Sequence, residues 1–163
     1  MKSSLVRVGT AFVGLGPLAG FVLACAGDGT GLDRNGNRVT QVSPCVPATG
    51  ACTGGVCFDV DIQPILSSNC AFSGCHAGTS PAQGQNLSDG VAYANIVCVA
   101  ANERPGMMRV RSFEPDSSYL VHKIQGTQGD VGGSGGQMPL GRTPLSQQQI
   151  SLIRAWITQG ARN

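Results

Sequence analysis

The chain has 163 residues, which fits one domain with an N-terminal extension. It contains 24 Gly and nine Pro but few charged (12%) and aromatic (5%) residues, which predicts short helices and long loops around a small core that a cofactor or disulfides would stabilise. The formal net charge is +2 and falls to zero once a predicted signal segment with Lys2 and Arg7 is removed, which argues against nucleic acid or an anionic membrane surface as a partner.

The first 24 residues have the pattern of a bacterial lipoprotein signal peptide. A basic start (residues 1–7) precedes an apolar, Gly-containing run (residues 8–24) that is short for a membrane-spanning helix. The run ends in the sequence VLAC (residues 22–25), which resembles a lipobox, where the Cys carries diacylglycerol after cleavage. We therefore expect a membrane anchor at lipidated Cys25. An ordinary signal peptide or a single membrane anchor is the alternative.

The segment after Cys25 is expected to link the membrane to a folded domain. Ala26 follows Cys25 where an Asp would retain a lipoprotein at the inner membrane, so we expect the protein on the periplasmic side of the cell envelope, at the outer membrane. Gly, Asn, Asp, Thr and Pro dominate the sequence that follows. We predict a flexible tether over residues 25–56 and a domain over residues 57–163.

Seven cysteines in an exported chain indicate an oxidising compartment. Cys52 and Cys57 are separated by four residues and followed by Phe58, so no metal-binding imidazole is adjacent, and we expect a small disulfide loop there. Cys45 and Cys98 are also available for disulfides, and the pairings of these four thiols stay open. A Cys57–Cys98 bridge that pins the second helix to the first is one option.

The first helix is predicted to run from about Asp59 or Asp61 to the region of Cys70. Pro64 falls in its first turn, where the missing N–H has no helical partner to lose. A partial stripe at helical spacing is expected to face the core. Its members are Phe58, Ile62, Ile65, Leu66 and Asn69.

Residues 70–76 (CAFSGCH) place two thiols and an imidazole within seven residues. Covalent haem attachment uses these groups in this order, usually as C-x-x-C-H: the thiols add to two vinyl groups and the His binds iron. Here four residues separate Cys70 from Cys75, so both sulfurs and His76 face one side only if residues 71–74 bulge outward. The alternative is a disulfide-closed loop with a solvent-facing His. A zinc site has no obvious fourth ligand.

Two short helices are predicted in the middle of the chain. Ser88 or Asp89 is expected to cap the first, and Glu114-Pro115-Asp116 carries the start signature of the second. The residues expected to face the core are Val91, Ala94 or Tyr93, and Val97 in the first helix and Leu120 and Ile124 in the second.

Met138 ends a loop rich in Gly, Gln, Ser and Asp (residues 125–136) and precedes Pro139. A thioether in this position can approach iron from the face opposite His76. His122 competes with Met138 as the sixth ligand. We favour Met138, because His122 falls in a short amphipathic helix, where an imidazole commonly caps the edge of a core.

The last helix has the clearest local signals. Ser146 is its expected N-cap, Gln149 completes a capping box, and Gly160 is its expected stop. Its apolar face consists of Ile150, Ile153, Trp156 and Ile157.

Together, these segments resemble class I c-type cytochrome domains, in particular exported bacterial ones common in myxobacteria and planctomycetes. The resemblance implies an all-α, cytochrome c-like fold in which the first and last helices cross and the rest wraps one haem c. It also implies thioether bonds at Cys70 and Cys75, His76 as the proximal iron ligand and Met138 as the distal one. The matching segments are residues 61–65 (DIQPI), Cys70 with Cys75 and His76, residues 92–93 (AY), residues 115–121 (PDSSYLV) with Lys123, residues 138–139 (MP), and residues 153–157 (IRAWI) with residues 160–161 (GA).

The expected function is electron transfer between redox partner proteins. The sequence has no paired acid–base set, nucleophile motif or open metal site, so we expect no enzyme; the porphyrin does the redox chemistry. The alternative is a haem-free lipoprotein, an interaction or structural module stabilised by disulfides that include Cys70–Cys75.

Overall fold

The computed structural model describes residues 45–50 and 52–163; the predicted signal peptide, Cys25 and most of the predicted tether lie outside these ranges. The described part is helix-rich and compatible with the all-α class, since it holds isolated β-bridges but no strand. None of its helices is long and apolar enough to cross a membrane. The helices, in chain order, are η1 (Phe58–Ile62), α1 (Gln63–Asn69), η2 (Ala82–Gly84), α2 (Ala92–Ile96), η3 (Pro115–Ser117), α3 (Tyr119–Gln125) and α4 (Gln147–Thr158).

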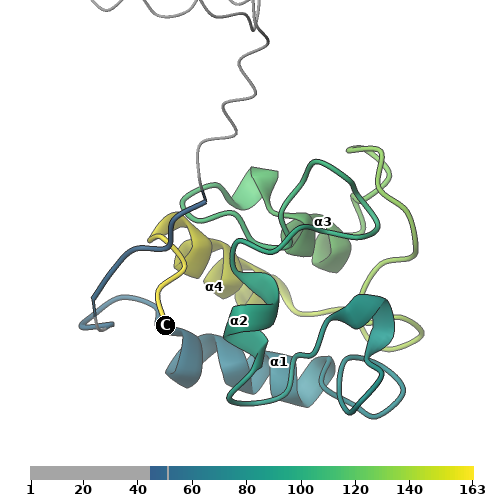
Figure 1. The fold of residues 1–163 in the computed structure, drawn as a ribbon, viewed down its shortest axis with the longest axis horizontal. Helices are drawn as coiled ribbons and strands as arrows, with labels where there is room; N and C mark the ends of the chain where they lie inside the picture. The colour runs from purple at the N-terminus through teal and green to yellow at the C-terminus, as the bar shows by residue number, and fades with distance from the viewer. Residues whose placement is uncertain (1–44, 51) are drawn as a thin grey trace, which may run out of the picture. The chain divides into compact units, whose positions relative to one another are not determined.

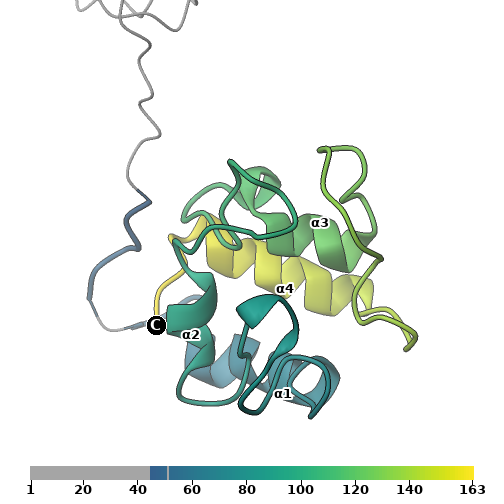
Figure 2. The same cartoon turned by 45° about the vertical axis from the view of Figure 1, so that its right-hand side comes forward.

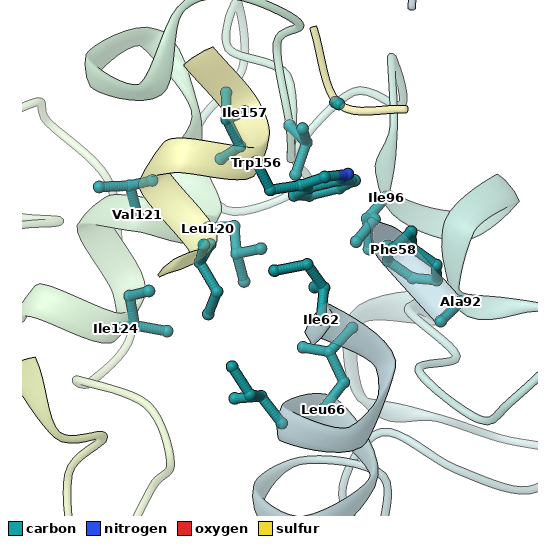
Figure 3. Packing of buried hydrophobic residues seen from close by; sticks show 14 of the residues in the cluster. Phe58, Ile62, Leu66, Ala92, Ile96, Leu120, Val121, Ile124, Trp156 and Ile157 are labelled. Atoms are coloured by element: carbon teal, nitrogen blue, oxygen red, sulfur yellow. The ribbon is translucent and has the colours of Figure 1, made fainter. Parts of the chain in front are cut away.

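The core forms where α3 and the start of the first helical segment pack against α4 (Figures 1 and 2). Trp156 of α4 is fully buried, and its ring centroid lies 5.2 Å from that of Phe58 in η1. Tyr93 of α2 completes the aromatic group, 5.3 Å from Phe58. Figure 3 shows Phe58 and Trp156 together with buried aliphatic side chains from α1, α2 and α3. The two ends of the domain sequence thus share one core.

The first helical segment covers the predicted range but is not one regular α-helix. It opens with the π-helical turn η1, in which Gln63 N–H bonds to Phe58 O, and continues as α1 with Pro64 in its first turn. Pro64 has no N–H to donate and its ring crowds the carbonyl one turn earlier, so a wider turn before it is tolerated. All the apolar members of the predicted stripe are buried, and Asn69 is half-buried.

The short helix α2 differs from its prediction in both its cap and its inner face. No side chain caps it; instead, the Ser88 carbonyl accepts hydrogen bonds from the N–H groups of Val91 and Ala92. The predicted Val97 is buried and Tyr93 is half-buried against the core, but Val91 is exposed. Ala92 and Ile96, which were not predicted, are also buried in the core. A single helical turn offers too little periodicity to identify its buried face from sequence.

The predictions for the two later helices are confirmed. The start signature at Glu114 marks the short turn η3, and α3 follows with Leu120 and Ile124 buried. At α4, Ser146 and Gln149 form the capping box in both directions. The four predicted apolar residues of α4 are buried and Gly160 lies just beyond its end.

The described part of the predicted tether is bonded to the domain. Cys45 forms a disulfide with Cys98, and the N–H of Ala48 donates to Gly160 O over 2.9 Å. Cys52 pairs with Cys57, which confirms the predicted small loop. The Cys57–Cys98 bridge is therefore wrong, and the described residues 45–50 and 52–56 are linked to the domain by these bonds.

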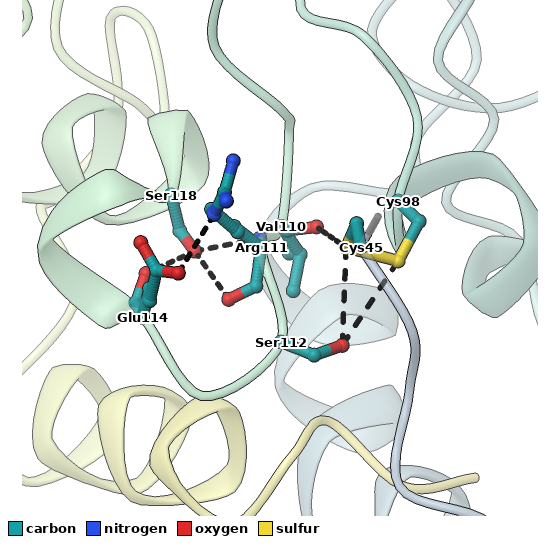
Figure 4. Close-up of polar contacts among 7 residues, drawn as sticks. All are labelled: Cys45, Cys98, Val110, Arg111, Ser112, Glu114 and Ser118. Carbon is teal, nitrogen blue, oxygen red and sulfur yellow. Dashed lines mark hydrogen bonds and ion pairs between the residues drawn. A yellow bond between two sulfur atoms is a disulfide. The ribbon is translucent and has the colours of Figure 1, made fainter. Parts of the chain in front are cut away.

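A polar cluster surrounds the Cys45–Cys98 disulfide (Figure 4). Ser112 Oγ lies 4.0 Å from each of its sulfurs. The following turn is held by Ser118, whose hydroxyl donates to the carbonyl of Glu114 over 2.9 Å and accepts from the N–H of Arg111 over 2.8 Å. The disulfide thus joins residue 45 to a well-bonded segment before α3.

Candidate cofactor site

A cavity of about 300 Å³ lies between the C-terminal end of α1, α3 and the segment after Gly136. Its wall contains all four residues predicted to bind a cofactor: Cys70, Cys75, His76 and Met138. The volume is within the range of ligand pockets. The fold therefore brings together two motifs that are distant in sequence.

The CAFSGCH segment folds as a compact turn directly after α1. The N–H of Cys75 donates to Phe72 O over 2.9 Å, and that of His76 donates to Cys70 O over 3.3 Å. Gly74 adopts a φ of 78°, a left-handed conformation that glycine takes at little cost. Residues 71–73 stay out of the cavity wall, while both cysteines and His76 line it. The two cysteines and His76 can therefore reach the same cavity without residues 71–73 lining it.

Cys70 and Cys75 are free thiols in different surroundings. Cys70 is buried, and this burial, followed by the neighbouring Cys75, raises the pKa of the Cys70 thiol to about 11, although Arg142 opposes the shift. Cys75 is exposed at the cavity edge. Both sulfurs are thus available for bonds to a ligand in the cavity.

The ring of His76 is held in the orientation and tautomer that suit metal binding. Its Nδ1 lies 3.2 Å from the Gln85 carbonyl, which can only accept, so Nδ1 carries the hydrogen and Nε2 keeps its lone pair. Burial lowers the pKa of His76 more than the hydrogen bond to Gln85 raises it. A neutral imidazole is the form that coordinates iron.

Met138 also lines the cavity, on a segment that contacts the CAFSGCH turn. The N–H of Met138 donates to the Lys123 carbonyl over 2.8 Å, which ties this segment to α3. Four residues later, the Arg142 guanidinium lies 4.2 Å from the centroid of the Phe72 ring. This cation–π contact connects the segment after Met138 to the CAFSGCH turn.

Arg109 is a buried cation in the cavity wall that sequence reasoning missed. The residue is 7% exposed, and its guanidinium donates to the carbonyls of Asn95 and Gln83, each over 2.8 Å, and of Gly84 over 3.5 Å. No ion pair among the described residues includes it. Burial lowers the pKa of Arg109. A cation held by carbonyls alone is well suited to a carboxylate of a bound molecule.

Three further polar residues of the wall were also missed: Glu103, Tyr119 and Lys123. Lys123 Nζ and Glu103 Oε2 form an ion pair of 2.7 Å. Tyr119 and Lys123 belong to segments that resemble c-type cytochromes, but the sequence pattern indicated no role in a cavity for either residue.

His122 does not line the cavity. Its Nδ1 lies 2.9 Å from Thr127 Oγ1 and its Nε2 lies 3.0 Å from the Asp116 carbonyl. Both ring nitrogens are therefore engaged outside the site. Of the two candidate sixth ligands, only Met138 lies at the cavity.

The described residues contain no group of three or more His, Cys, Asp and Glu side chains that could hold a metal ion. Comparisons of the chain with protein-family models, with curated proteins and with solved structures gave no match.

Proposed function

We propose that this protein is a c-type cytochrome that transfers electrons through one covalently attached haem, held in the cavity of a cytochrome c-like fold. The convergence of Cys70, Cys75, His76 and Met138 on one cavity is the observation that carries the proposal. The motif requires both thiols and the imidazole at one site, and the Met138 thioether, from another segment, would supply a further iron ligand.

Each side chain has a distinct role in holding the group. The thiols of Cys70 and Cys75 would hold haem through two thioether bonds, each formed by addition of an S–H group across a vinyl group, which needs no external oxidant. His76 binds iron through Nε2, because Nδ1 donates to Gln85. Met138 supplies a soft thioether sulfur, a weak donor that favours Fe(II) over Fe(III).

The rest of the wall suits an apolar ring with charged substituents. Leu87, Leu120 and Ile124 are buried side chains of the wall that exclude water from the site. Arg109 donates hydrogen bonds to a haem carboxylate, which provides the buried guanidinium with an anionic partner. When bound, haem supplies reversible one-electron chemistry, and no side chain has to act as a catalyst.

The proposed cellular location is based on the predicted lipoprotein signal peptide. We propose that lipidated Cys25 anchors the protein on the periplasmic side of the outer membrane. The domain then passes electrons between redox partner proteins within reach of the anchor.

The mass of the matured protein tests the proposal. We expect the chain expressed with a cytochrome c maturation system to keep the added mass of one haem after denaturation, despite the four-residue spacing between Cys70 and Cys75. The Cys70→Ala/Cys75→Ala variant should lose this mass, whereas Cys52→Ala/Cys57→Ala should retain it. A colourless product without added mass would overturn the proposal.

The haem-free alternative is supported by the two disulfides, Cys45–Cys98 and Cys52–Cys57, which give the domain cross-links that do not need a cofactor. In this alternative the protein is an interaction or structural module. It predicts a third disulfide, Cys70–Cys75, and a mass lower by two protons in place of the haem mass.

A further inference from the structure

The glycine-rich loop before Met138 is fastened at Ser134 by two other parts of the domain. The Ser134 carbonyl accepts hydrogen bonds from the Tyr119 hydroxyl over 2.9 Å and from Lys123 Nζ over 3.2 Å. The Ser134 N–H donates to the Glu103 carbonyl over 3.1 Å. One loop residue thus contacts α3 and the segment after α2.

The ion pair between Glu103 and Lys123 joins the same two parts of the domain, the segment after α2 and α3. Its side chains are only 17% and 8% exposed, whereas those of the ion pair between Asp116 and Arg154 are 83% and 32% exposed. Solvent screens an exposed pair strongly, and removal of one partner from a buried pair leaves an uncompensated charge. Removing one partner of the Glu103–Lys123 pair is therefore expected to disturb its two segments more than the same change in the exposed pair.

Two glycines let the loop backbone lie directly on these side chains. A Cβ at Gly133 would lie 2.5 Å from the Tyr119 ring, and one at Gly135 would lie 2.6 Å from the Glu103 carboxylate and 2.7 Å from Lys123 Nζ. Cβ atoms essentially never lie this close to another heavy atom, so a side chain at either position would force its neighbours to shift. The loop is therefore fitted against Tyr119, Glu103 and Lys123 rather than merely close to them.

The same residues connect the loop to the cavity. Glu103, Tyr119 and Lys123 all line it, and the carbonyl of Lys123 accepts the N–H of Met138 over 2.8 Å. Gln137, the residue before Met138, donates from its side chain to the Ile124 carbonyl over 3.2 Å. The bonds at Ser134 and those at Gln137 and Met138 thus fasten two points of one short stretch, four residues apart, to α3.

We propose that Glu103, Tyr119 and Lys123 are positioning residues that clamp the loop and so determine how often Met138 leaves the iron and admits an external ligand. This inference rests on the proposed function. With the clamp intact, the state in which Met138 has left is rarely populated, and an external ligand binds with an apparent affinity reduced by that small fraction. Weakening the clamp raises the fraction and the apparent affinity.

Imidazole titration of the matured ferric protein tests the clamp. We expect Glu103→Gln to increase the apparent imidazole affinity roughly tenfold and Tyr119→Phe, which removes one hydroxyl, about threefold. Asp116→Asn makes the matched change in the exposed ion pair and should leave the affinity unchanged. Met138→Ala gives the affinity of a permanently open site.

The outcomes separate the clamp from the proposed function. Unchanged imidazole affinity in Tyr119→Phe and Glu103→Gln, with full haem content, overturns the clamp and leaves the cytochrome assignment standing. If Glu103→Gln does not fold, Tyr119→Phe decides, because it keeps the ring and both charges. If Met138→Ala binds imidazole no more tightly than the unchanged protein, Met138 is not the ligand and the clamp falls. A colourless unchanged protein overturns the proposed function itself.

Discussion

The two thiols of the CAFSGCH turn differ in reactivity because one is buried and the other is not. Only a thiolate reacts readily with alkylating reagents, and the buried Cys70 thiol has a pKa raised to about 11. In the haem-free chain at pH 8, iodoacetamide should therefore modify exposed Cys75 well before Cys70. Peptide mapping by mass spectrometry measures the order. Denaturant should remove the difference, and equal rates in the folded chain would contradict the prediction.

Substitutions of Met138 and of His122 should have opposite effects on the absorption spectrum of the matured protein. Met138→Ala should abolish the far-red absorption band of a thioether–iron bond, since Met138 lines the cavity. His122→Gln should leave the band in place, because both nitrogens of His122 bond elsewhere. A ferric absorption spectrum of each variant checks this. Loss of the band in His122→Gln alone would reverse the assignment.

Among single residues, the sequence predicted those with chemically distinctive side chains. It missed Arg109, whose role depends on its burial in the folded domain. Cys70, Cys75, His76 and Met138 carry thiol, imidazole and thioether groups in an order that has few uses. Arg109 could not be found in the same way, because most arginines are exposed. Its burial depends on carbonyls that only the folded loops bring around it.

Among the elements, α4 is the one on which the core depends most. Trp156 is fully buried, packs against Phe58, and donates from Nε1 to the Arg162 carbonyl over 2.7 Å. Trp156→Ala should lower the free energy of unfolding by about 3–5 kcal/mol, through lost packing and a residual cavity. Ser151→Ala, an exposed change on the same helix, should alter it by less than about 0.5 kcal/mol. Urea denaturation of both variants provides the comparison.

The elements differ in how well sequence predicted them because they differ in local signal. In α4, the capping box and four apolar residues at helical spacing define both the start and the buried face. In α2 neither signal exists: the helix starts through backbone bonds to Ser88, and the Tyr93 hydroxyl donates to the distant Ala161 carbonyl over 2.8 Å. Contacts made after folding, rather than local pattern, determine such a helix.

For the whole domain, the two disulfides close loops of very different length. Cys45 and Cys98 are 53 residues apart, and Cys52 and Cys57 only 5. In the chain-entropy model, loss of the long loop costs about 4 kcal/mol and loss of the short one about 2 kcal/mol. Cys45→Ala/Cys98→Ala should therefore destabilise the matured protein more than Cys52→Ala/Cys57→Ala.

Urea midpoints of the two double variants measure this difference. If removal of the Cys52–Cys57 disulfide lowered the stability more, the Cys45–Cys98 disulfide would not act mainly by restricting the unfolded chain. The pairing of Cys45 was open at the sequence level, because four thiols allow three connectivities and their order in the chain does not report which segments meet in space.

The Cys45–Cys98 bond also determines how the domain bears a mechanical load. Tension applied to the chain ahead of residue 45 passes through the two sulfurs to the segment after α2, and bypasses residues 46–97. The helix that delivers Cys70 and the turn that holds His76 lie inside this shielded stretch. If the proposed lipid anchor is pulled, the covalent path of the load therefore does not include the turn that holds His76.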